Sequence, residues 1–71
     1  MEISDVKAAI RAGTLVEMTG PPDFTGIRYT VRGVIMRLDA ETGGWKYYAE
    51  LADQRGCITV SPLNRVVTAN G

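Results

Sequence analysis

The alternation of apolar and polar residues changes phase once within residues 27–38. Before the change, the apolar positions are Ile27, Tyr29 and Val31; after it, they are Val34, Met36 and Leu38. Because strand side chains alternate between two faces, one extra residue exchanges those faces. The change falls at Arg32-Gly33, and glycine readily adopts the left-handed conformation that a β-bulge can require. We therefore expect one long strand, sharply bent at Gly33, that serves two parts of one core.

The composition of the 71 residues limits both size and chemistry. Residues 1–71 are expected to form a single domain with a small core. Eight basic residues balance eight acidic ones, which argues against binding driven mainly by phosphate neutralisation. There is no histidine and only one cysteine, Cys57, so the usual zinc ligands and nucleophile pairs are missing. We expect a noncatalytic protein with no catalytic residues, no metal and no cofactor.

The sequence also suggests where the protein works. No apolar run approaches the length of a membrane span. Residues 1–11 lack the basic start and apolar block of a signal peptide. We therefore expect a cytoplasmic protein with no membrane partner.

A short helix is expected at about residues 4–12. Ser4 would cap it and Gly13 would end it. Its apolar stripe has helical spacing and would dock on an open end of the β-structure; the stripe consists of Ile3, Val6 and Ile10.

Strands are expected at residues 14–19, 27–38, 45–52, 57–61 and 65–68. Several side chains are assigned to the core on their alternation, namely Val16, Met18, Tyr29, Tyr47, Ile58, Val60 and Val66. Pairing Leu38 with Trp45 sets Arg37 opposite Lys46 and Ile35 opposite Tyr48 on the outer face. Residues 53–56 form a hairpin turn with a left-handed glycine, and Leu63 closes the core from a 3₁₀ turn.

The order of these elements resembles an SH3-like barrel over residues 14–68. Trp45 opens the third strand, where the eukaryotic SH3 family has its ligand-groove tryptophan. Residues 56–66 are similar to the end of that family, with Arg65 roughly where a groove tyrosine would stand. The resemblance implies a mainly β fold, a small five-stranded SH3-like barrel with a short N-terminal α-helix.

Two further resemblances concern the fold and the origin of the chain. An Sm-like barrel also has a helix before five bent strands. A helix, a strand and a closing segment like residues 56–66 are similar to small barrel proteins of bacterial phages and conjugative elements. The second of these resemblances implies a bacterial phage or mobile-element origin, and neither implies a specific activity.

The first functional hypothesis is an interaction module that binds a protein or peptide. In SH3-like barrels, peptides dock against aromatic residues in a cleft between the first long loop and the 3₁₀ turn. The residues expected to line that cleft are Phe24, Trp45 and Arg65. The alternative is that Phe24 anchors its loop and Trp45 closes the edge of the barrel, since small proteins use their few aromatic residues in the core.

The second hypothesis is nucleic-acid binding by the outer face of the central hairpin. Its candidate residues combine basic groups with an aromatic ring, and they are Arg28, Arg37, Lys46 and Tyr48. Alternatively, the basic side chains only cover the apolar pair Ile35 and Tyr48. An ion pair between Arg32 and Glu50 is also expected. The exposed apolar groups are compatible with assembly into a homo-oligomer.

Overall fold

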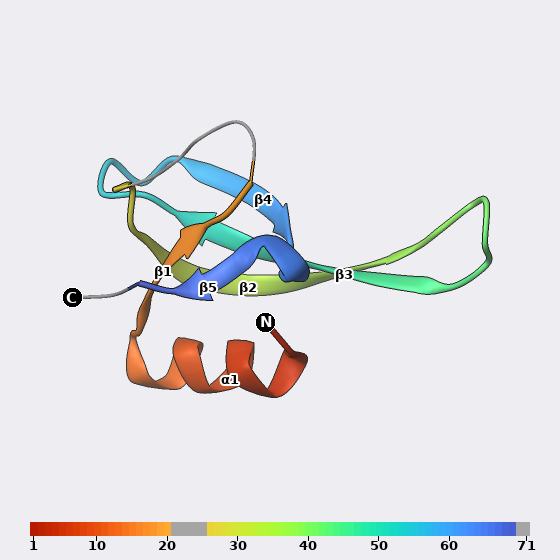
Figure 1. Cartoon of the computed structure of the whole chain (residues 1–71), viewed down its shortest axis with the longest axis horizontal. Helices are drawn as coiled ribbons and strands as arrows, with labels where there is room; N and C mark the ends of the chain where they lie inside the picture. Colours follow the sequence, from red (N-terminus) through yellow and green to blue (C-terminus); the bar gives the residue numbers. More distant parts are fainter. Residues whose placement is uncertain (21–25, 70–71) are drawn as a thin grey trace.

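The computed structural model describes residues 1–20 and 26–69. It contains one helix, five strands and one 3₁₀ turn (Figure 1). In chain order these are α1 (Ile3–Ala12), β1 (Leu15–Met18), β2 (Tyr29–Leu38), β3 (Trp45–Ala52), β4 (Ile58–Pro62), η1 (Leu63–Arg65) and β5 (Val66–Thr68). The candidate residue Phe24 lies outside the described residues.

The strands form a single antiparallel sheet in the order β4-β3-β2-β1-β5. The predicted mainly β fold with five strands and a short N-terminal helix is confirmed. Within the described residues, β4 and β5 are the two edges and do not pair with each other. The sheet is therefore open, and it resembles a barrel only in the way it curves around its core.

The predicted bulge in β2 is present. Val31 pairs with Leu51 and Gly33 pairs with Glu50, so that Arg32 has no partner position on β3. The glycine does not act as expected, because Gly33 is not among the glycines with positive φ. The bulge thus forms with Gly33 outside the left-handed region, and an added Cβ there would meet only Glu50 Oε1, at 3.9 Å.

The core lies between α1 and the curved sheet. Its main members come from α1, β1, β2, β3, η1 and β5, and they are Val6, Ala9, Val16, Met18, Tyr29, Val31, Ala49, Leu51, Leu63 and Val66. The predictions for Val16, Met18, Tyr29, Leu63 and Val66 are confirmed. Leu63 does lie in a 3₁₀ turn, and Gly56 is left-handed with φ 84°.

The helix differs from the prediction at its start and along its buried side. Glu2, not Ser4, is the N-cap, and its backbone N–H donates to Asp5 Oδ2 at 3.0 Å. The buried side is centred on Val6 and Ala9. Ile10 is rotated about 100° from Ala9 around the helix axis, which explains why it is 42% exposed and not in the core.

Strand β4 has the opposite phase to the one predicted. Ser61 pairs with Ala49 and Thr59 pairs with Leu51, so Thr59 and Ser61 face the core. Ile58 and Val60 consequently point outward and are 52% and 41% exposed. The cross-strand register therefore overrides the apolar pattern of this short strand.

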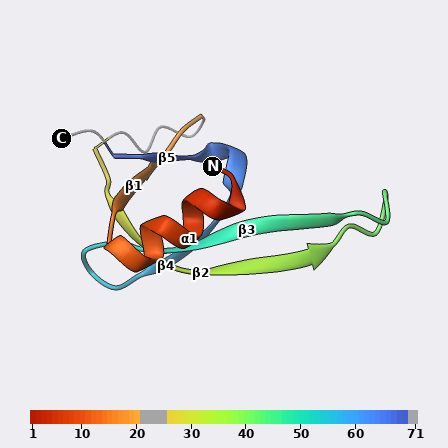
Figure 2. The same cartoon turned by 90° about the horizontal axis from the view of Figure 1, so that it is seen from below.

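The hairpin formed by β2 and β3 extends well beyond the rest of the molecule (Figures 1 and 2). Its far end is not covered by α1 in either view. Tyr47 is 41% exposed for this reason, and its predicted place in the core is wrong. No helix within the described residues is both long and apolar enough to span a membrane.

Candidate binding surface

The projecting part of the hairpin, residues 34–48, is here called the arm. From Met36 to Tyr47 it is a ribbon of two strands, because β1 pairs with β2 only at Tyr29 and Thr30 and β4 pairs with β3 no further than Tyr48. Two-stranded hairpins are marginally stable in water unless something packs against one face. Within the described residues, the arm therefore lacks the packing that usually stabilises a hairpin of two strands.

One face of the arm is almost wholly apolar and exposed. Cross-strand pairs place its side chains together, and the set, here called the arm face, is Val34, Met36, Leu38, Trp45 and Tyr47. These side chains are 39%, 54%, 59%, 56% and 41% exposed, in that order. The same face continues into the core at Ala49, the partner of Val34.

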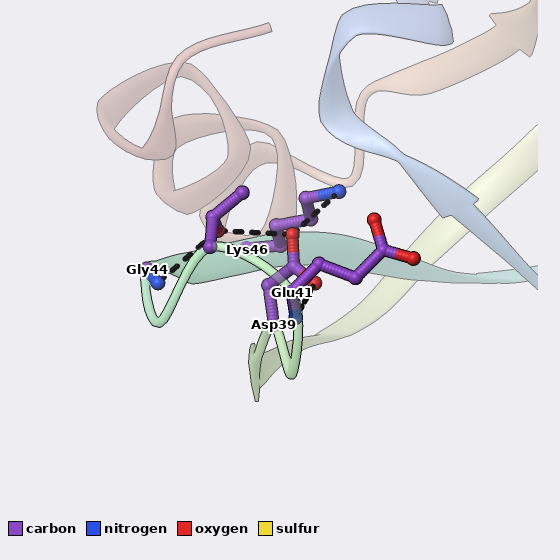
Figure 3. Close-up of polar contacts among 5 residues, drawn as sticks. Asp39, Glu41, Gly44 and Lys46 are labelled. Atoms are coloured by element: carbon purple, nitrogen blue, oxygen red, sulfur yellow. Dashed lines mark hydrogen bonds and ion pairs between the residues drawn. The ribbon is translucent and has the colours of Figure 1, made fainter.

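The turn at the tip of the arm is held by Asp39 (Figure 3). Its Oδ1 accepts from the backbone N–H of Glu41 at 3.1 Å, and its Oδ2 accepts from the Thr42 hydroxyl at 3.0 Å. The Thr42 hydroxyl in turn accepts from the Gly44 N–H at 3.2 Å, and Lys46 Nζ lies 3.2 Å from Asp39 Oδ2. These contacts give the tip one defined conformation.

The same contacts lower the pKa of Asp39. The hydrogen bond from the Glu41 backbone has the largest effect, followed by those from Lys46 and Thr42. All three favour the charged carboxylate over the neutral acid, so the pKa lies below its ordinary value of 3.8. In the folded turn, Asp39 is therefore ionised at neutral pH.

The opposite face of the arm is basic and partly aromatic. The predicted pairs Arg37 with Lys46 and Ile35 with Tyr48 are confirmed. The Arg37 guanidinium carbon lies 5.4 Å from the centre of the Tyr48 ring, and Lys46 is paired with Asp39.

The other charged residues expected on that face are placed differently. Arg28 lies before β2 and lines a separate hollow with Asp53 and Arg55, so the structure does not bring it to Arg37. Arg32 and Glu50, both within the described residues, form no ion pair, because Glu50 is matched with Gly33 and Arg32 occupies the bulge.

A hollow of about 670 Å³ lies between the base of the arm and η1. Its lining combines the start of the chain with residues of β3, β4 and η1, and it includes Met1, Glu2, Lys46, Tyr47, Tyr48, Pro62 and Arg65. Arg65 also joins η1 to the end of β1, since its Nε donates to the Thr19 carbonyl at 2.8 Å. The Thr19 N–H donates back to the Arg65 carbonyl at 2.7 Å.

The predicted partner-binding residues are thus distributed over different places. Trp45 lies on the arm face, Arg65 lines the hollow without Trp45, and Phe24 is outside the described residues. Sequence reasoning did not include Met36 and Leu38 as candidates, because their alternation placed them in the core. The signal that was available is the length of the hairpin, which exceeds what a ten-residue helix can cover.

Within residues 1–20 and 26–69, no three His, Cys, Asp or Glu side chains lie close enough together to hold a metal ion. No family model matches the sequence, and comparisons with curated proteins and with solved structures gave no significant match.

Proposed function

We propose that this chain is a noncatalytic protein-binding module whose contact surface is the arm face. The observation that carries the proposal is the exposure of five large apolar side chains on a face without a charged group. Monomeric proteins rarely expose a contiguous apolar patch of more than a few hundred Å² unless it binds something.

The composition of the arm face favours a protein over a small molecule. Protein interfaces are enriched in Trp, Tyr and Met at their centres and depleted of charge there. The arm face supplies Trp45, Tyr47 and Met36 on an open ribbon, whereas small molecules are usually enclosed by concave sites. The contacts of Asp39 order the tip before binding, which reduces the entropy lost on association.

Two further parts of the proposal concern fold family and compartment. An SH3-like origin for residues 14–68 agrees with a role in protein contacts, and the arm then replaces the peptide cleft of that family as the main surface. Cys57 is an exposed, unpaired thiol, and such a thiol is most stable in a reducing compartment. We therefore propose a cytoplasmic protein.

Photo-crosslinking in the cells that contain the gene tests the proposal. A benzoylphenylalanine residue replaces Tyr47 on the arm face, or Ile58 as a control on β4 that is similarly exposed. We expect a protein adduct from position 47 that disappears when Leu38→Glu is added, and little adduct from position 58. Absence of any adduct at position 47 would overturn the proposal.

A second candidate function is binding of single-stranded nucleic acid by the opposite face of the arm. The observation that favours it is the packing of the Arg37 guanidinium on the Tyr48 ring beside Lys46, because such a surface can stack a base and contact a phosphate. It predicts binding to a labelled oligonucleotide that weakens with salt and with the double change Arg37→Gln and Lys46→Gln. Absence of binding at low salt would exclude it.

A further inference from the structure

The arm face has the chemistry of a surface that pairs with itself. We propose that its partner is a second copy of this chain, and that two arms stack face to face and antiparallel around a twofold axis near Met36 and Tyr47. This inference rests on the proposed function, because it assigns an occupant to the same face.

The first argument is charge. A twofold contact sets the same patch against itself, so any charged group near its centre would be brought close to its own copy. The five side chains of the arm face carry no charge, and the basic pair Arg37 and Lys46 belongs to the other side of the ribbon. At the base of the arm, Tyr47 shares the hollow with Glu2 and the Met1 amino group, whose charges are opposite in sign. The whole chain has a formal net charge of zero, which removes long-range repulsion between copies.

The second argument is area. The arm face has two aromatic side chains of roughly 150–250 Å² each and three smaller aliphatic ones, all exposed by about half, which together give on the order of 500 Å². That is about a tenth of the total surface of 4928 Å², which is the share that a standard interface uses on a small protein. Two copies would bury about 1,000 Å² together, the lower limit for a specific contact.

The third argument is steric. The helix α1 lies on the core side of the hairpin base and leaves the arm uncovered (Figure 2). Two arms stacked in parallel would bring both helices to the same end, where they would collide. The antiparallel stack sends the two bodies to opposite ends, and the middle pair of the arm, Met36 and Tyr47, then lies at the axis.

The oligomeric state of the purified chain tests the proposal. Sedimentation equilibrium between about 1 µM and 1 mM should show a change from one-chain to two-chain mass. Leu38→Glu on the arm face should weaken dimerisation by at least about tenfold. Ile58→Glu is the matched control, since both side chains are exposed aliphatic groups in strands, and it should change the dissociation constant less than about twofold.

The arrangement has its own test in a charge exchange at the axis. Met36→Glu and Met36→Lys should each prevent dimerisation, because each sets a charge against its own copy. An equimolar mixture of the two variants should restore the two-chain mass. A mixture that stays at one-chain mass, with the wild type dimeric, would overturn the antiparallel stack.

The remaining outcomes separate this inference from the proposed function. A wild type that keeps one-chain mass throughout would overturn the dimer. Crosslinking from position 47 to a different protein would then leave the proposed function standing, whereas absence of any adduct would remove both. A dimer that resists Leu38→Glu but is lost with Ile58→Glu would assign the contact to the β4 edge and also overturn the inference.

Discussion

Asp39 is the residue on which the conformation of the arm's tip depends most. Replacing it with Asn keeps the shape but removes the charge that Lys46 and the turn donors stabilise. We expect Asp39→Asn to lower the free energy of unfolding, measured by urea titration. Glu41→Gln is the control, because Glu41 contributes to the turn through its backbone N–H, which that change retains.

The pKa of Asp39 gives this prediction a pH dependence. The folded-state pKa is lowered, so its contribution to stability is fully present above the ordinary value of 3.8 and is lost as the pH falls through the folded value. The difference in stability between the wild type and Asp39→Asn should therefore shrink below pH 3.8. Carboxyl NMR should give Asp39 a titration midpoint below 3.8, and a midpoint above it would contradict the proposed contacts.

Replacing Gly56 or Gly33 with alanine should change the free energy of unfolding in different directions. Gly56 has φ 84° in the β3–β4 turn and open space around its Cα, so Gly56→Ala costs only backbone strain, about 1–2 kcal/mol. Gly33 lies in the strand outside the left-handed region, and an added methyl group would contact Glu50 at an ordinary 3.9 Å. Gly33→Ala should leave stability unchanged or raise it by up to about 1 kcal/mol. Urea denaturation of both variants measures the difference, and equal losses would contradict it.

At the scale of the element, α1 packs on the sheet through a narrow buried side that consists of Val6 and Ala9. Val6 is fully buried, so Val6→Ala should cost about 2 kcal/mol of unfolding free energy. Ile10→Ala, on the same helix but 42% exposed, should change it by no more than about 0.5 kcal/mol. Chemical denaturation of the pair measures both values; a larger loss at Ile10 would mean that the helix docks on a different side.

The arm should open more readily than the body of the sheet. Residues 36–38 and 45–47 pair only with each other, whereas residues 48–52 of β3 have neighbours on both sides. Hydrogen exchange of dilute protein should therefore be faster in the arm than at Ala49 and Leu51. At concentrations where the proposed dimer forms, exchange in the arm should slow while the middle of β3 changes little.

Local chemistry made much of this fold predictable from the sequence. The bulge at Arg32 and Gly33, the turn at Gly56, the 3₁₀ position of Leu63 and the register of Leu38 with Trp45 all follow from alternation and turn residues. The errors arose where tertiary contacts decide. In β4 the register with β3 determines the inward side, so Ile58 and Val60 are outside although they are the apolar residues.

At the scale of the whole molecule, the core ends before the hairpin does. Apolar alternation identifies which side chains share a face, and it did so correctly for Trp45, Tyr47 and Ala49. It does not say whether anything covers that face, because cover depends on the length and position of α1. The sequence therefore predicts a binding role for Trp45 from its place at the start of a strand, and it predicts core positions for Met36 and Leu38, which the structure exposes.

The bulge at Arg32 determines which face of β2 each side chain beyond it occupies. The length of the arm beyond the bulge can change without altering that assignment, as long as the change is even. Inserting two residues into each strand between the bulge and the tip would keep every side chain on its present face and leave the body's contacts intact. Inserting a single residue into one strand would turn the apolar side chains of that strand to the basic side. The reach of the molecule can thus change in steps of two residues while the rest of the fold stays the same.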